Sequence, residues 1–252
     1  VDYGINTITI VMNNKSWGAE KAYQKDFFGK RYIGADISSP PFDKVAELYG
    51  AKGFKVEKVI SDLMFLDGTK IGLFGGSFDP PHSGHVHFSL QAIKHFNLDK
   101  VIWLISPGNP LKSMSPAPIQ TRLRQAQKIV HSPKIIISKV ETEIGAQYSW
   151  ETLDYLSLKY PRTKFVWLMG SDNLAQFHLW KNWKWIIDNF PIGVLARPQF
   201  RQKGLNSKVS KIYKSHKLPA NQGRLLPYYP SPKWCFSNMP LMKVSSSEIR
   251  KK

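Results

Sequence analysis

From residue 71 onward, short apolar runs alternate with stretches of helical periodicity. In the first helical stretch Val86, Leu90 and Ile93 fall at near-helical spacing and would form one apolar face. Short, almost continuous apolar strands separated by amphipathic helices are typical of a parallel sheet covered on both faces. We therefore predict an α/β fold with a parallel sheet and helices on both faces. The predicted strands are Ile71–Phe74, Val101–Ser106, Ile135–Ser138, Phe165–Met169 and Ile192–Ala196, and the predicted helices are Gly84–Phe96, Ile119–Val130, Ser149–Lys159 and Trp183–Asn189.

The first quarter of the chain stands apart from this alternation. Residues 1–63 resemble a partial α/β fragment, with a strand-like run at Ile5–Val11 and a helix-like stretch at Phe42–Tyr49. These residues offer little apolar surface to bury, and a piece of this size is marginal as an independent fold. A fresh start at Met64 leads into the first core strand. We therefore expect one domain over residues 64–252, preceded by an incomplete, non-functional fragment.

The charge of the chain is strongly basic and uneven. The chain has 36 Lys and Arg against 18 Asp and Glu, a net charge of +18, of which +16 lies after residue 60. Such an excess favours polyanions, either nucleic acid or phosphorylated small molecules. Residues 201–222 contribute scattered Lys, Arg and Ser, and we interpret them as a basic surface excursion rather than a part of the core.

Other bulk features exclude several classes of protein. Cys235 is the single cysteine, so the chain has no internal disulfide and no thiol pair for zinc or redox chemistry. No run approaches the roughly 18 consecutive apolar residues of a membrane span, and no secretory signal precedes the first strand-like run. We expect a cytoplasmic protein without a membrane partner, while the oligomeric state stays open.

The loop between the first predicted strand and the first helix is the most informative segment. It reads Gly75-Gly76-Ser77-Phe78-Asp79-Pro80-Pro81-His82-Ser83-Gly84-His85. In an open parallel sheet ligands bind where strands end, and a helix N-terminus offers N–H groups and a positive dipole to a phosphate. His82 and His85 are three residues apart at a helix start, so both can face one phosphate. A glycine-rich turn with one histidine is common, but this combination indicates a phosphate site, with further candidate ligands at Gly75, Gly76, Ser77 and Phe78.

This loop resembles the H/T-x-G-H signature of the nucleotidylyltransferase superfamily. A second superfamily motif lies near the end of the chain, where Val244-Ser245-Ser246-Ser247-Glu248-Ile249-Arg250 resembles Ile-Ser-Ser-Thr-x-Ile-Arg. Serine hydroxyls at a helix start together with one arginine suit the β- and γ-phosphates of a nucleotide. The resemblance covers nearly all of residues 64–252. It implies a Rossmann-like sheet and phosphate contacts from Ser246, Ser247 and Arg250.

Four inner segments resemble the nicotinate mononucleotide adenylyltransferases of this superfamily. Ser106–Lys112 resembles their second-strand loop, and Tyr148–Leu153 resembles their Tyr-Thr-x-x-Thr-Leu segment. Gly170–Asn173 and then Phe177–Trp180 resemble their adenine-side loop and the aromatic wall of their pyridine pocket, and Arg197-Pro198 matches their Ala-Arg-Pro ending. The resemblance implies ATP contacts from Gly170, Ser171 and Asp172, and mononucleotide contacts from Lys112, Ser149, Trp180 and Arg197.

Two details of this resemblance leave the pyridine contacts open. Lys181 follows Trp180 where some members of the family carry a tyrosine. Trp180 itself fits a pocket wall and ordinary packing equally well, whereas we interpret Trp183 and Trp185 as packing residues.

The resemblance implies transfer of the adenylyl group of ATP to nicotinic acid mononucleotide, giving deamido-NAD and pyrophosphate. The attacking 5′-phosphate is ionised at neutral pH, so catalysis requires positioning and charge stabilisation rather than a general base. His82, His85 and Arg250 would be the catalytic residues. Mg²⁺ would arrive with ATP, because this ion usually binds through phosphates and waters. We therefore expect no dedicated metal ligands.

Residues 1–60 resemble an unrelated family. Val11–Lys21 is similar to the downstream half of the cofactor motif of thiamine-diphosphate enzymes of the acetolactate synthase and sulfoacetaldehyde acetyltransferase type. Asn14 would be a Mg²⁺ ligand there, but the Gly-Asp-Gly half of the motif is absent, so we expect no thiamine diphosphate. Because Val1 is not a methionine, we expect the sequence to begin inside a longer segment. A gene fusion, a frameshift and an assembly artefact all stay open as origins of the join.

Two other functions compete with the nicotinate enzyme. A pantetheine-phosphate adenylyltransferase or a cytidylyltransferase would share both end motifs, although Pro107–Lys112 and Gly170–Asn173 argue against it. An inactive basic RNA-binding protein would explain the charge, although both histidines and Arg250 are retained. We expect ATP and nicotinic acid mononucleotide as partners rather than nucleic acid. The preference between the nicotinate and the nicotinamide nucleotide is not fixed by the sequence.

Overall fold

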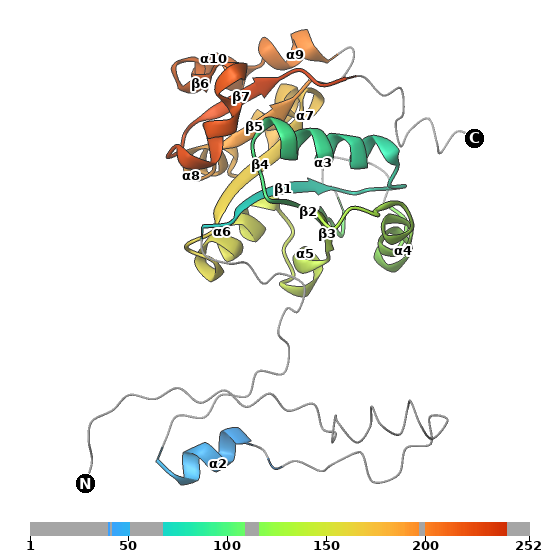
Figure 1. Cartoon of the computed structure of the whole chain (residues 1–252), viewed down its shortest axis with the longest axis vertical. Helices are drawn as coiled ribbons and strands as arrows, with labels where there is room; N and C mark the ends of the chain where they lie inside the picture. The colour runs from blue at the N-terminus through green and yellow to red at the C-terminus, as the bar shows by residue number, and fades with distance from the viewer. Residues whose placement is uncertain (1–39, 41, 51–67, 109–115, 197–199, 241–252) are drawn as a thin grey trace. The chain divides into compact units, whose positions relative to one another are not determined.

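The computed structural model describes residues 40, 42–50, 68–108, 116–196 and 200–240 (Figure 1). The chain divides into two compact units, Val1–Ser61 and Asp62–Lys252. The described residues of the first unit form the helix α2 (Phe42–Leu48), where the sequence predicts a helix. The strand-like run predicted at Ile5–Val11 lies outside the described residues.

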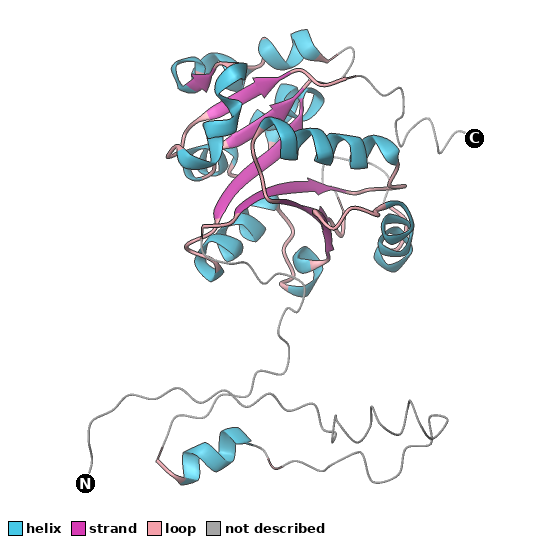
Figure 2. Cartoon of the chain, in the orientation of Figure 1, coloured by secondary structure: helices cyan, strands magenta, loops and turns pink. Residues whose placement is uncertain are grey.

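In its described part, the second unit is built on a seven-stranded sheet in which all neighbouring strands run parallel (Figure 2). The strands are β1 (Lys70–Gly76), β2 (Lys100–Ile105), β3 (Ile135–Ser138), β4 (Lys164–Gly170), β5 (Ile192–Leu195), β6 (Lys217–Leu218) and β7 (Trp234–Ser237). Their order is β3-β2-β1-β4-β5-β7-β6. In chain order, β2 and β3 thus lie on one side of β1, and β4 and the later strands lie on the other. The carboxyl ends of β1 and β4 form a topological switch point, where open α/β sheets bind ligands.

Helices cover both faces of this sheet (Figure 1). They are α3 (Ser83–His95), α4 (Ile119–Ile129), α5 (Val140–Glu143), α6 (Ser149–Lys159), α7 (Ser171–Gln176), η1 (Phe177–Leu179), α8 (Trp183–Asn189), α9 (Arg201–Leu205), α10 (Lys208–Ile212), η2 (Lys214–His216) and η3 (Ala220–Tyr228). Buried side chains of α3, α4 and η3 pack on one face, and α5 and α6 lie on the opposite side. Leu73 and Phe74 are both buried although neighbouring strand residues point to opposite faces, so β1 is covered on both.

The predicted α/β fold, a Rossmann-like parallel sheet with helices on both faces, is confirmed. All five predicted strands and all four predicted helices are present, and their ends differ from the prediction by at most two residues. Within the described ranges, no helix combines the length and the apolar character that a membrane crossing requires.

The interpretation of residues 201–222 as a basic surface excursion is wrong. The segment forms α9, α10, η2, β6 and the start of η3, and it buries Val209, Tyr213 and Leu218. The lysines of this segment are exposed, and its buried apolar residues stand singly between them. An analysis of periodicity therefore does not detect that the segment contributes to the core. The sheet also continues beyond the fifth predicted strand with β7, which carries the buried Trp234.

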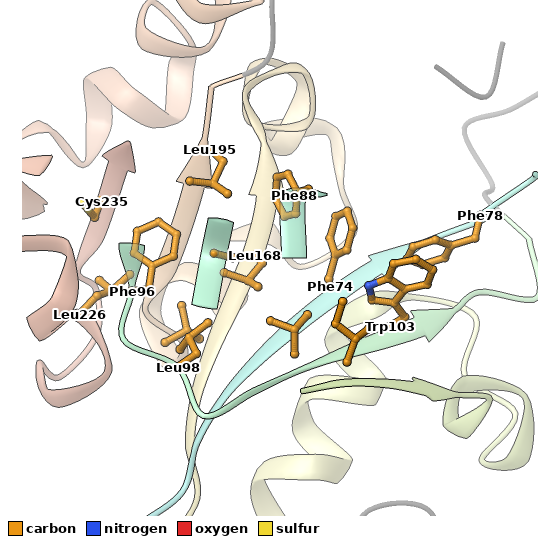
Figure 3. Close-up of a cluster of buried hydrophobic side chains, with 14 of the residues drawn as sticks. Phe74, Phe78, Phe88, Phe96, Leu98, Trp103, Leu168, Leu195, Leu226 and Cys235 are labelled. Atoms are coloured by element: carbon orange, nitrogen blue, oxygen red, sulfur yellow. The ribbon is translucent and has the colours of Figure 1, made fainter. Parts of the chain in front are cut away.

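An aromatic core between the sheet and α3 supports the end of β1 (Figure 3). Phe74 of β1 stacks on Phe88 of α3 with 4.3 Å between the ring centroids. Trp103 of β2 stacks on Phe78, which follows β1, with 4.7 Å between the centroids. These contacts fix the start of α3 over the carboxyl ends of β1 and β2.

Candidate active site

The candidate site begins in the loop that joins β1 to α3. Gly75 lies against Trp167 of β4, and a Cβ at this position would be 2.6 Å from the Cη2 atom of that ring. Phe78 is buried and has a φ of 46°, in the left-handed region that aromatic residues rarely adopt. Such a backbone persists only where the surrounding packing holds it. The loop is therefore held in a fixed shape.

His82 and His85 are brought together at the first turn of α3. The backbone N–H of Gly84 donates to Nδ1 of His82 at 3.1 Å, and the backbone N–H of His82 donates to Nδ1 of His85 at 3.2 Å. The two rings are buried, with 3.8 Å between their centroids. A neutral imidazole that accepts at Nδ1 carries its proton on Nε2. The cap of α3 thus makes both rings donors at Nε2.

The His85 ring packs against aromatic rings, and the backbone of His85 accepts a hydrogen bond from a serine hydroxyl. The Phe78 ring lies 4.9 Å from the His85 ring, centroid to centroid, and the Trp103 ring lies 5.9 Å from it. Nε1 of Trp103 donates to Oγ of Ser89 at 2.7 Å, and this hydroxyl donates to the carbonyl oxygen of His85 at 2.9 Å. The first turn of α3 is therefore tied to β2 as well as to β1.

Arg122 is a site residue that the sequence analysis missed. It lies on α4, is 1% exposed, and donates to the carbonyl oxygens of Ser77 and Ser106 at 2.6 and 2.7 Å. Burial lowers the pKa of its guanidinium, and the negative charge of Asp79 opposes this shift. A signal was present in the sequence: Arg122 stands between Ile119 and Ala126 on the apolar stripe of α4, where a cation is unexpected.

The loop from β4 to α7 forms the other side of the switch point. Gly170 ends β4 and precedes α7, and Ser171 is fully buried. Gly204 of α9 packs so closely that a Cβ there would be 2.9 Å from the carbonyl oxygen of Ser171. Asp172 follows, half-buried, in the first turn of α7. The predicted ATP contacts of these residues stay predictions.

Trp180 is half-buried and lies beside this loop. Its ring packs edge-on to Phe177 at 5.4 Å and to Trp167 at 6.3 Å, centroid to centroid. Packing therefore accounts for part of Trp180, while its role as a pocket wall stays a prediction. Trp183 and Trp185 are also half-buried, and each makes edge or tilted ring contacts.

Several buried polar atoms on this side have no hydrogen-bond partner among the described residues. They lie on three elements: Trp150 Nε1 and Thr152 Oγ1 on α6, Trp167 Nε1 on β4, and His178 Nδ1 on η1. Ser149, the predicted nicotinate contact, is the first residue of α6. Because an unpaired buried polar atom is costly, each such atom in a native structure requires an explanation. A bound polar ligand that pairs with these atoms would be one such explanation.

Five predicted site residues lie outside the described residues: Lys112, Arg197, Ser246, Ser247 and Arg250. One contact bears on the last three. Nε2 of His87, on α3, lies 3.0 Å from the carbonyl oxygen of Pro240, the last described residue. The chain therefore passes α3 six residues before Ser246.

Two further observations concern charge. The described part of the chain contains no group of three or more His, Cys, Asp or Glu side chains that could hold a metal ion. Glu141 of α5 is 5% exposed, and burial raises the pKa of its carboxyl group to about 8. This carboxyl is therefore neutral over much of the range below pH 8.

Comparison with protein families divides the chain at a similar place. Residues 73–252 match the family described as "Cytidylyltransferase-like". Residues 1–65 match "Thiamine pyrophosphate enzyme, C-terminal TPP binding domain". Both resemblances seen in the sequence are thereby confirmed.

Curated relatives and solved structures are similar to the second part. Proteins named "Probable nicotinate-nucleotide adenylyltransferase" from Ruegeria sp. (strain TM1040) and Roseobacter denitrificans are each 50% identical to the chain, over 182 and 185 residues. These matches cover 72% and 73% of the chain and 96% and 93% of the relatives. A structure of Plasmodium falciparum nicotinic acid mononucleotide adenylyltransferase complexed with NaAD is 20% identical, with a TM-score of 0.54, and the match covers 73% of this chain and 83% of that one. At this identity the structure supports the fold alone.

Proposed function

Since the chain belongs to the cytidylyltransferase-like family, among its nicotinate-nucleotide adenylyltransferases, we propose that residues 64–252 transfer the adenylyl group of ATP to nicotinic acid mononucleotide. The products are deamido-NAD and pyrophosphate. The observation that carries this proposal is the pair of Nε2 donors of His82 and His85 at the switch point of the sheet. Donors fixed at a helix N-terminus are suited to phosphate groups.

The reaction is an in-line displacement at the α-phosphate of ATP. An oxygen of the mononucleotide 5′-phosphate forms a bond to the α-phosphorus, and the bond from this phosphorus to the pyrophosphate oxygen breaks. The attacking oxygen is already ionised, so no proton has to be removed. His82 and His85 hold the phosphates in line and stabilise the charge that develops there. Their supports on α3 and β2 let them do so without reorganisation.

The leaving pyrophosphate is assigned to Ser246, Ser247 and Arg250. The contact between His87 and Pro240 supports this assignment, since it brings the chain to α3 shortly before these residues. Six residues of extended chain span at most about 20 Å. The motif can therefore reach the histidines.

The two substrates are assigned to different sets of residues. ATP is assigned to the loop of Gly75, Gly76, Ser77 and Phe78 and to Gly170, Ser171 and Asp172. The mononucleotide is assigned to Lys112, Ser149, Trp180 and Arg197. The unpaired buried atoms around α6 and η1 support a polar ligand near Ser149 and Trp180, because a ligand would supply the missing partners.

Mg²⁺ is proposed to enter with ATP, bound through the phosphates and waters. It would neutralise charge on the phosphates. An ion bound in this way needs no full set of protein ligands.

Residues 1–63 are proposed to take no part in this reaction. They match the C-terminal domain of thiamine pyrophosphate enzymes, whereas the cytidylyltransferase-like match begins at residue 73 and the first core strand at Lys70. We therefore propose that adenylyl transfer by this chain requires no thiamine diphosphate. The substrates, both soluble phosphorylated nucleotides, suit a cytoplasmic enzyme.

The test is pyrophosphate release from ATP with each of three acceptors: nicotinic acid mononucleotide, nicotinamide mononucleotide and phosphopantetheine. Nicotinic acid mononucleotide is expected to exceed phosphopantetheine by orders of magnitude, since a site built to pair a ligand's polar groups rejects molecules that leave them unpaired. Comparable use of phosphopantetheine would favour a pantetheine-phosphate adenylyltransferase. No turnover with any acceptor would favour an inactive nucleic-acid-binding protein.

A further inference from the structure

One buried guanidinium joins the loops that follow two neighbouring strands. Nη1 of Arg122 donates to the carbonyl oxygen of Ser77, after β1, at 2.6 Å and to that of Ser106, after β2, at 2.7 Å. Nε donates to the carbonyl oxygen of Ala117 at 2.7 Å, and Nη2 donates to that of Pro107 at 3.4 Å. Since Arg122 stands on α4, three segments of the chain meet at one planar group.

Packing alone does not explain this residue. Arg122 is 1% exposed, and among the described residues it forms no ion pair within 4.0 Å. Burying a guanidinium costs free energy that the carbonyl dipoles and the negative charge of Asp79 offset only in part. An apolar side chain could fill the same volume at a lower cost. What an apolar side chain cannot do is direct several donors in a fixed plane. The geometry of the two loops is therefore the feature that requires an arginine.

The two loops are those assigned above to the two substrates. Ser77 precedes Phe78 in the loop assigned to ATP, and Ser106 and Pro107 open the segment that leads to Lys112. The backbone N–H of Ser106 donates to the carbonyl oxygen of Gly76 at 3.0 Å, which joins the loops at their base. Arg122 adds a second connection, between the carbonyl oxygen of Ser77, one residue after Gly76, and that of Ser106.

We propose that Arg122 is a positioning residue that fixes the ATP loop to the mononucleotide loop. This inference rests on the proposed function. In-line transfer requires the attacking oxygen and the α-phosphorus to be held at a set distance, and a displacement of 1 Å can slow such a reaction about 100-fold. Arg122 sets this distance without touching either substrate.

The test compares Arg122→Lys, Arg122→Gln and Arg122→Met with the control Arg124→Met, which changes an exposed arginine on the same helix. Each loop still binds its own substrate, so KM for ATP and for the mononucleotide should change less than about fivefold, while kcat should fall about 100-fold in the Gln and Met variants. Lys keeps the charge but not the planar fork, so kcat should fall about tenfold. The control should match the wild type.

Rates are expressed per folded enzyme, from near-UV circular dichroism and thermal unfolding of each variant. A purely structural role would lower activity only with the folded fraction, and Lys would not differ from Gln once this is corrected. Folded Gln and Met variants with kcat within threefold of the wild type would overturn the proposal. So would a failure of all three variants to fold, because the guanidinium would then serve folding.

The wild type is measured first. If it does not turn over ATP with nicotinic acid mononucleotide, the proposed function fails, and the positioning role fails with it. If it does turn over and the Arg122 variants keep its kcat, only the positioning role fails.

Discussion

The two sides of the switch point differ in how their polar groups are satisfied. On the β1–β2 side, both histidines accept backbone N–H groups, the indole of Trp103 donates to Ser89, and Arg122 donates to several carbonyl oxygens. On the β4 and α6 side, buried atoms have no partner among the described residues: Trp150 Nε1, Thr152 Oγ1, Trp167 Nε1 and His178 Nδ1. A side that is already paired needs no reorganisation when charge develops. Unpaired buried groups carry a free-energy cost that new hydrogen-bond partners would relieve. The difference accords with the proposal that His82 and His85 hold the phosphates and that Ser149 and Trp180 contact the mononucleotide.

The largest expected effect is the loss of turnover when a histidine of the paired side is replaced. His82→Ala and His85→Ala should each lower kcat about 10²–10³-fold, the usual loss when one preorganised donor to the transition state is deleted. His82→Asn and His85→Asn keep an acceptor where Nδ1 stands, and so keep the cap of α3, but lack the Nε2 donor. They should be as slow as the Ala variants and more stable to heat. His131→Ala, at an exposed site, is the control. Near-normal turnover in any of the four variants would contradict the assignment.

Gly75→Ala tests the contact between Gly75 of β1 and the ring of Trp167 of β4, where the two sides of the switch point meet. The new methyl group would lie 2.6 Å from the ring of Trp167, which is fully buried and cannot move aside. Overpacking of this kind should lower the free energy of unfolding by about 1–3 kcal/mol, measured by urea denaturation. The double variant Gly75→Ala/Trp167→Phe lacks the clashing Cη2 atom and should regain part of this loss. If the single variant is as stable as the wild type, the two sides are less tightly fitted than the structure indicates.

Glu141 tests the paired side through the pH dependence of stability. It is a buried acid on α5, a helix that contacts β2. Its pKa is raised from 4.5 to about 8 by burial, so the folded protein keeps a proton that the unfolded chain releases. The contribution of this group to stability is complete below pH 4.5 and is lost as the pH rises to about 8. The slope is at most about 1.4 kcal/mol per pH unit. Urea denaturation at several pH values should show that Glu141→Gln removes this slope.

Glu143→Gln is the matched control for this measurement, since Glu143 is exposed on the same short helix. It should leave the slope unchanged. Parallel stability curves for the wild type and Glu141→Gln would show that the buried carboxyl does not titrate as described.

Thr152→Val sharpens the comparison on the unpaired side. The change keeps the shape of a buried side chain and deletes a hydroxyl group that has no partner among the described residues. The free protein should therefore be unchanged or up to about 1 kcal/mol more stable. If the acceptor pairs with this hydroxyl, KM for the mononucleotide should rise about fivefold, the equivalent of roughly 1 kcal/mol. Thr121→Val, at an exposed position of α4, should change neither value. A large loss of stability in Thr152→Val would mean that the hydroxyl is already paired.

The smallest effect is expected from removing residues 1–63. The first core strand starts at Lys70, and both sides of the comparison lie after it. A protein of residues 64–252 should have the kcat and KM of the whole chain, and thiamine diphosphate should change neither. Misfolding or loss of adenylyl transfer in the shortened protein would place the first 63 residues inside the enzyme.

The sequence predicted the central part of the sheet well because those strands are buried on both faces. Strands such as β2 and β4 therefore appear as nearly continuous apolar runs. β6 has two residues, and β7 follows a Pro- and Ser-rich stretch, so neither has a run that periodicity can detect. Residues 201–222 were misjudged because their charge is on the surface while their few apolar residues are in the core.

The site was predictable where a motif fixes local geometry, and not where distant segments meet. His82 and His85 lie together because they are three positions apart across the first turn of α3. Arg122 could not be assigned in the same way, since its acceptors after β1 and β2 are 45 and 16 residues away. The unpaired atoms on α6, β4 and η1 depend likewise on tertiary packing, which gives no signal in sequence.

The strand order has a consequence for how the protein is made. β1 is the first strand in the chain, yet it lies near the middle of the sheet, and its register pairs Lys70 with Lys164. The second partner of β1 is thus made 94 residues after it. At about 5–20 residues per second on a ribosome, β1 waits roughly 5–20 s for β4. During this interval an apolar strand edge is open to other chains, and the switch point exists only once β4 has emerged and docked.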